Sequence, residues 1–185
     1  MPRKKGKCKI ASESVLATRA AELHNIMLSL ESIGAQPMIG GNVLLGIMRE
    51  GDLLRHGTGI KIHCKAEKLI PLIDKIANIL EKKEYECELF KDKGIEKIIA
   101  RKDFVCFEIE AWHDDGKYRW RWKTQLPREL MENRKVVSLR GQSLQTFSNP
   151  IAYLEWRYKT WQTPINSTDR REYENQIYWR GMWQK

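Results

Sequence analysis

Two short stretches of the sequence carry residues that could handle a phosphorylated ligand. Gly40 and Gly41 stand between an expected strand and an expected helix. A glycine pair there lets the backbone approach a ligand, and the first N–H groups of a helix favour a phosphate. In CFEIEAW, alternation puts Glu108 and Glu110 on one face of an expected strand, so both carboxylates can point at a cleft. Each signal is weak alone, because Gly-Gly turns are common and the glutamates could lie on a solvated face.

The elements that must position these residues follow from hydrophobic periodicity. Apolar residues in 12–34 recur every three or four positions, which predicts a helix with one buried stripe. This stripe consists of Leu16, Ala20, Leu23, Met27 and Leu30. The remaining pattern predicts a strand at 36–41, helices at 42–51 and 66–84, and strands at 59–64, 85–90, 95–102, 104–113 and 117–125. We see no internal repeat and no composition break, so one α+β domain is the simplest interpretation.

Bulk composition narrows the class of protein. The 185 residues fit one domain, and no apolar run approaches the roughly 20 residues that a membrane span needs. The basic start has no hydrophobic segment behind it, so we expect no signal peptide and a cytoplasmic or intracellular location. The cysteines are scattered, without a CxxC pair or a histidine at zinc-ligand spacing, which favours buried reduced thiols over a zinc site.

The formal net charge of +9 raises the question of an anionic partner. Basic residues gather in the leader 1–10 and in KYRWRWK, 117–123, where they alternate with aromatic residues. Such a pattern can hold phosphates and stack on bases. A solvated tail and one strand with a basic polar face are the preferred interpretation. A nucleic-acid site is a lower alternative, and attraction to an anionic glycan, an acidic lipid surface or a nucleotide phosphate is another.

Two longer motifs resemble the marks of the LicD family, which includes phosphocholine transferases of bacterial surface glycans and the fukutin-type ribitol-phosphate transferases. GGNVLLGIMREGDLL resembles the family's opening, GTLLGxxRxGGFI. NPIAYLEWRYKTWQTP resembles its second mark, eYLexrYGdWxTP. The two motifs stand far apart and in the family's order, and they frame most of the chain, from about 38 to 164.

The resemblance implies a nucleotidyltransferase-type fold, a mixed sheet flanked by helices. It places Gly41 and Asn42 where the family contacts the donor phosphate, and Arg49 at the family's arginine after the short helix. In the family, closely spaced aspartates hold divalent cations that bridge the phosphate oxygens of the donor.

The metal-binding segment of the family is degenerate in this sequence. Where the family has PWDDDIDI this chain has RHGTGIKI, so the metal-binding aspartates fall on Gly59 and Lys61. Glycine offers no ligand, and a lysine ammonium repels a cation. Glu108 and Glu110 are the candidate remnant catalytic carboxylates, and we expect one of them to pair with Lys61 where the cation would sit. This requires strand 59–64 to lie beside the strand that carries the two glutamates.

These observations favour a pseudoenzyme that acts as a binding or structural component of an assembly, without a cofactor. The alternative is an active transferase of phospho-substituents onto glycans from a CDP-linked donor, in which Glu108, Glu110 or Asp52 recruits Mg²⁺ or Mn²⁺. We divide the chain into the basic leader 1–10, a LicD-like domain 11–166 and an aromatic tail 167–185. The tail is expected to serve a protein partner or self-association, because aromatic residues at such density favour a docking surface.

Overall fold

The computed structural model of the protein describes residues 10–56, 59–164 and 175. Its helices are α1 (Glu13–Ser32), α2 (Gly41–Glu50), α3 (Ala66–Leu69), the 3-10 turn η1 (Ile70–Leu72), α4 (Ile73–Glu81), the 3-10 turn η2 (Arg128–Met131) and α5 (Pro150–Arg157). Its strands are β1 (Met38–Ile39), β2 (Ile60–Lys65), β3 (Glu86–Phe90), β4 (Lys97–Lys102), β5 (Val105–Asp114), β6 (Tyr118–Arg121), β7 (Thr124–Pro127), β8 (Lys135–Leu139) and β9 (Gln142–Thr146).

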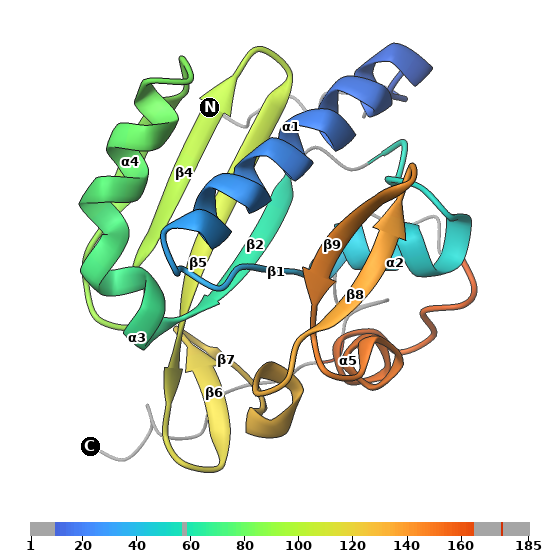
Figure 1. Cartoon of the computed structure of the whole chain (residues 1–185). Helices are drawn as coiled ribbons and strands as arrows, with labels where there is room; N and C mark the ends of the chain where they lie inside the picture. The colour runs from blue at the N-terminus through green and yellow to red at the C-terminus, as the bar shows by residue number, and fades with distance from the viewer. Residues whose placement is uncertain (1–9, 57–58, 165–174, 176–185) are drawn as a thin grey trace, which may run out of the picture.

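The strands form a mixed sheet in the order β3-β4-β5-β2-β1-β9-β8. Strand β2 pairs in parallel with β5, and β1 pairs in parallel with β9, whereas the other neighbours are antiparallel. The far end of β5 pairs with β6, which forms a hairpin with β7. In Figure 1 this hairpin extends from the lower end of the sheet. The long β5 therefore links the centre of the sheet to the hairpin.

Helices α1 and α4 lie over the same face of the sheet (Figure 1). Helix α1 begins after Ser12, whose hydroxyl accepts the N–H of Val15, and it buries the predicted stripe together with Ile26. The helix predicted at 66–84 differs from expectation, because residues 66–81 divide into α3, η1 and α4. Pro71 lies in η1, where its missing N–H and its ring interrupt the α-helical hydrogen bonding.

A second apolar cluster joins helices α2 and α5 to the hairpin and to the end of β5. Its members include Leu44, Trp112, Leu126 and Phe147. In α5 and just after it, Tyr153, Leu154 and Tyr158 are buried in this cluster, so the segment packs back onto the domain as the sequence predicts. Burial of these large side chains fixes the C-terminal helix beside α2.

The predicted α+β class, with a mixed sheet flanked by helices in a single domain, is confirmed. No helix among the described residues combines the length and the apolar character that a membrane span requires. The leader 1–9 and the tail, apart from Asn175, lie outside the described residues. The domain boundaries and the roles assigned to leader and tail therefore stay predictions.

Candidate functional site

A pocket of about 220 Å³ opens on the face of β2 and β5 that α1 and α4 do not cover. Alternation along β2 explains this position, because Ile60, Ile62 and Cys64 face the core while Lys61 and His63 face the pocket. The lining residues come from the start of α2, from β2, β5 and the hairpin, and from α5 and the residue after it. They are Gly41, Asn42, Gly59, Lys61, His63, Glu108, Glu110, Trp112, Arg121, Thr124, Gln125, Leu126, Tyr153, Trp156, Arg157 and Tyr158.

The parallel pairing of β2 with β5 brings the predicted site residues together. Lys61 is the register partner of Glu108, and His63 is the partner of Glu110. The Nζ atom of Lys61 lies 2.9 Å from Glu108 Oε2 and 2.8 Å from Glu110 Oε1. The prediction that strand 59–64 lies beside the strand of the two glutamates is confirmed, with β2 beginning at Ile60. Lys61 contacts both carboxylates rather than one.

Two further cations hold the same carboxylates. Lys97 Nζ lies 2.7 Å from Glu108 Oε1, and Arg121 Nη2 lies 3.1 Å from Glu110 Oε1 and 3.7 Å from Glu108 Oε1. We call Lys61, Lys97, Arg121, Glu108 and Glu110 the Lys61 network. Three positive side chains face two negative ones, so the network keeps a surplus of one positive charge. Both carboxylates are already occupied by protein cations.

The ionisation of Glu108 follows from these contacts. Burial raises the pKa of its carboxyl, but the hydrogen bond from Lys97 and the charge of Lys61 outweigh burial and lower the pKa to about 2. Glu108 is therefore a carboxylate at any ordinary pH. A group with so low a pKa is a poor general acid or base near neutral pH.

His63 forms the floor of the pocket as a neutral ring. Burial lowers its pKa well below the usual value, and the charges of Lys61, Arg121 and Arg157 lower it further. Its Nδ1 accepts the indole N–H of Trp112 at 2.9 Å, which places the ring proton on Nε2. The buried Nε2 has no hydrogen-bond partner among the described residues.

Glycine is favoured at positions 40 and 41 for two different reasons. A Cβ on Gly40 would lie 2.7 Å from the His63 ring and from the Phe147 ring, so the backbone there packs against the protein's own side chains. Gly41 has a φ of +54°, a left-handed value that favours glycine. The N–H of Gly41 donates to the Tyr153 hydroxyl at 2.9 Å, so part of the helix start is already bonded within the protein.

The positions that match the family's metal ligands do not fit a divalent cation. Gly59 supplies no side chain, and the Lys61 ammonium lies between the two carboxylates that could otherwise bind a cation. Among the residues that the structure describes, no group of three or more His, Cys, Asp or Glu side chains has the geometry of a metal site.

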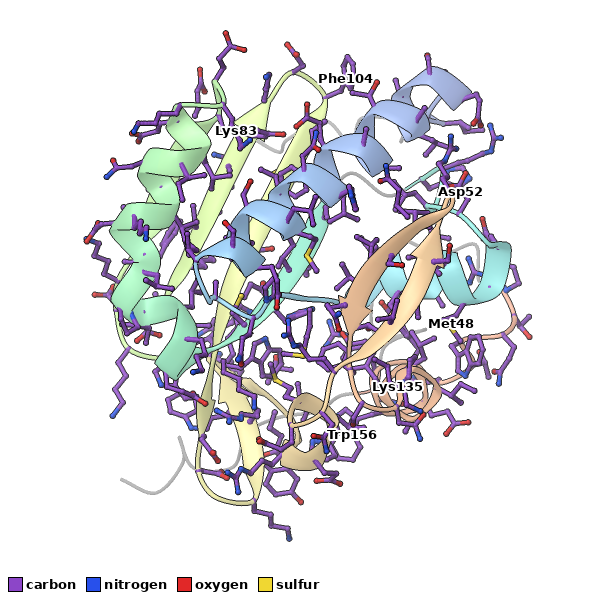
Figure 2. All side chains as sticks on the ribbon, in the orientation of Figure 1. Met48, Asp52, Lys83, Phe104, Lys135 and Trp156 are labelled. Atoms are coloured by element: carbon purple, nitrogen blue, oxygen red, sulfur yellow. The ribbon has the colours of Figure 1, made fainter. Side chains whose placement is uncertain are left out.

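Two residues named from the sequence lie away from the pocket. Arg49 is at the far end of α2 from Gly41 and pairs with Glu50 at 2.7 Å. Asp52 accepts a hydrogen bond from Arg140 Nε at 2.9 Å and one from the Leu53 N–H. Figure 2 shows Asp52 near the tip of the β8–β9 hairpin, at the opposite side of the view from the pocket residue Trp156. The geometry therefore joins Gly41, Asn42, Gly59, Lys61, Glu108 and Glu110 in one pocket and leaves Arg49 and Asp52 outside it.

Comparison with known proteins supports the fold. A scan against protein-family models and a search of curated proteins found no match. Among solved structures, the crystal structure of ANT(2'')-Ia in complex with adenylyl-2''-tobramycin aligns with a TM-score of 0.53 at 14% identity, over 71% of this chain and 70% of that chain. The chain has a nucleotidyltransferase-like fold.

Two further solved structures are similar. The solution structure of ANT(2'')-Ia aligns with a TM-score of 0.53 at 14% identity, over 72% of this chain and 66% of that chain. A candidate nucleotidyltransferase from Thermotoga maritima aligns with a TM-score of 0.49 at 16% identity, over 75% of this chain and 84% of that chain. At these identities the likeness concerns the fold alone.

Within this nucleotidyltransferase-like fold, several pocket residues were missed from the sequence, among them His63, Arg121 and Arg157. Arg121 belongs to the basic and aromatic run that was taken as a solvated strand face. Its side chain is only 13% exposed, because β6 turns back beside the site and directs it at Glu110. Alternation puts Arg119 and Arg121 on one face of β6, and this pattern in the sequence could have indicated that Arg121 points inward. Because Arg119 and Arg121 contact carboxylates inside the protein, neither is available to contact a nucleic acid at the surface of the hairpin.

Proposed function

We propose that the protein is a LicD-like pseudoenzyme, a nucleotidyltransferase-fold protein that binds a ligand or a partner and performs no metal-dependent transfer. One observation supports this most directly: Lys61 Nζ lies within 2.9 Å of both Glu108 and Glu110. On the resemblance to LicD, the Lys61 ammonium would take the place of the dication that the family holds between carboxylates. The LicD motifs supply the family, and the fold is consistent with it.

The physical basis is the exchange of metal charge for protein charge. A transferase of this kind needs carboxylate oxygens that are free to bind a dication against the donor phosphates. In this chain those oxygens already bind Lys61, Lys97 and Arg121. A dication entering here would have to displace an ammonium and withstand repulsion from the remaining cations, with no carboxylate at Gly59 to compensate.

Restoring the two matched aspartates tests the proposal. A Cβ on Gly59 meets no atom within 4 Å, so Gly59→Asp is sterically permitted. Gly59 stands just before β2 and lines the pocket together with Lys61, so Gly59→Asp with Lys61→Asp adds two carboxylates to the lining that contains Glu108 and Glu110. We expect calorimetry to detect Mn²⁺ binding to this double variant and none to the wild type.

The matched control is Gly59→Asn with Lys61→Asn, which has similar size without the new negative charge and is expected to bind no Mn²⁺. Metal-dependent release of CMP from a CDP-linked donor by the unchanged protein would contradict the proposal. That result would favour the active transferase, with its ligands supplied by Glu108 or Glu110 after Lys61 moves aside.

The aromatic tail is proposed to recruit the partner or a second copy of the chain. Asn175 donates hydrogen bonds to the carbonyls of Glu155, Trp156 and Arg157, so the chain returns to the end of α5 at this residue. Ending the chain after Asn175 keeps these bonds and removes Tyr178, Trp179 and Trp183. A sizing column should then show a smaller assembly, and an unchanged elution volume would count against this role.

A further inference from the structure

We propose that the pocket binds a small phosphomonoester and does so without a divalent cation. This rests on the proposed function, because it needs Lys61 in the position of the metal. The class of ligand follows from the charge of the pocket, from the buried donors that lack a partner, and from the size and walls of the pocket.

Charge is the first argument. The Lys61 network retains one positive charge, and the guanidinium of Arg157 also lines the pocket. The charge of Arg157 acts inside the pocket, since it lowers the pKa of the buried His63 ring. A net positive charge in a partly enclosed site of low dielectric favours an anion, such as a phosphate monoester.

Donors without partners are the second argument. His63 Nε2 carries the ring proton and has no acceptor among the described residues, although the side chain is 4% exposed. The Nε atom of Arg121, a further N–H donor of the lining, also lacks a partner there. An unpaired buried donor costs about 1–3 kcal/mol. Phosphate oxygens accept several hydrogen bonds and are suited to both donors.

The pocket's size and walls give the third argument. Its volume of about 220 Å³ is below the roughly 300–1,000 Å³ of pockets that hold drug-sized ligands. Trp156 and Tyr158 form aromatic walls, and Asn42 lies beside them, with its side-chain oxygen 3.4 Å from the Tyr158 hydroxyl. We therefore assign a phosphate joined to a small polar organic group.

Calorimetry with ribose 5-phosphate as the probe tests the assignment. Titrations of the full chain in EDTA should show binding, and the Kd should stay the same when Mn²⁺ replaces EDTA. Inorganic phosphate should bind more weakly, because it lacks the organic group, and ribose without phosphate should not bind.

Two charge-matched variants locate the binding. Arg157→Gln removes one cation of the lining and should raise the Kd for ribose 5-phosphate about tenfold or more. Lys83→Gln removes the same charge from an exposed side chain, which Figure 2 shows far from Trp156, and should leave the Kd unchanged.

The outcomes separate this inference from the proposed function. Absence of binding in both EDTA and Mn²⁺, or equal weakening by the two variants, overturns the ligand assignment and leaves the pseudoenzyme proposal standing. Binding that requires Mn²⁺ overturns both. Metal-independent binding that Arg157→Gln weakens and Lys83→Gln does not is the supporting result.

Discussion

Two ion networks meet the hairpin β6–β7, and they differ in charge balance. The Lys61 network sets three cations against two carboxylates, and all its members except Lys97 line the pocket. A second network surrounds the buried Arg119 and is named after it here. It consists of Lys65, Arg119, Arg128, Glu67, Asp114 and Glu132.

The Arg119 network is balanced, with three cations and three carboxylates. Arg119 Nη1 lies 2.9 Å from Glu67 and Nη2 lies 3.2 Å from Glu132, so one guanidinium joins α3 to the residue after η2. A balanced network of this kind serves the fold and presents no net charge to a ligand. The surplus in the Lys61 network agrees with the proposal that the ligand binds at that end of the hairpin.

The largest effect is expected from removing the hub of the balanced network. Arg119→Met should lower the free energy of unfolding by about 3 kcal/mol, because the buried guanidinium, 2% exposed, loses contacts with three carboxylates. Urea unfolding measures the change. Arg101→Met, which removes a half-exposed pair with Glu88, is the control and should cost less than about 1 kcal/mol. Equal losses would show that the Arg119 network contributes no more than a surface pair.

A smaller effect is expected at the glycine that supports the floor of the pocket. Gly40→Ala puts a Cβ 2.7 Å from the rings of His63 and Phe147, so both buried side chains must shift. Overpacking of this kind costs about 2 kcal/mol. Gly59→Ala meets open space and should change stability by less than about 1 kcal/mol. The comparison fails if urea unfolding gives both variants the same midpoint.

Local patterns in the sequence were sufficient to predict much of the fold. The stripe of α1 and the alternation of β2 and β5 depend on residues close in sequence, and each was predicted correctly. The break of the 66–84 segment at Pro71 was missed. A proline in the first turn is compatible with one continuous helix, but Pro71 lies beyond the first turn of the 66–84 segment, where its ring and missing N–H interrupt the α-helical hydrogen bonds.

The site was harder to predict, because its residues meet through contacts distant in sequence. The pairing of Lys61 with the glutamates followed from strand alternation and the family motif. Gly40 was read as a point of ligand approach, yet Phe147 and His63 occupy the space beside it. No local pattern predicts that Phe147 returns to this position after β9. Alternation puts Arg121 on one face of β6, but it does not predict that the hairpin directs that face at Glu110.

The smallest predicted effect tests the Lys61 network by its dependence on pH. The pKa of Glu108 is about 2 in the folded protein against an ordinary value of 4.5, so its carboxylate stabilises the fold above pH 4.5, and this contribution is lost as the pH falls from 4.5 to 2. Glu108→Gln should therefore cost stability on the order of 1–2 kcal/mol at pH 6, after allowance for solvent screening, and the difference from wild type should shrink through that window.

Glu88→Gln is the matched control, since Glu88 is also a strand glutamate paired with an arginine but is about half exposed. Its variant should differ little from wild type at any pH, because an exposed pair contributes little. Urea unfolding of both variants and of the wild type between pH 2 and pH 6 measures the two profiles. If the Glu108→Gln difference stays constant across that range, the carboxylate gains no stabilising charge contact from Lys61 and Lys97. The Lys61 network would then be a set of close but energetically neutral pairs, and the proposed replacement of a metal by protein cations would lose its electrostatic basis.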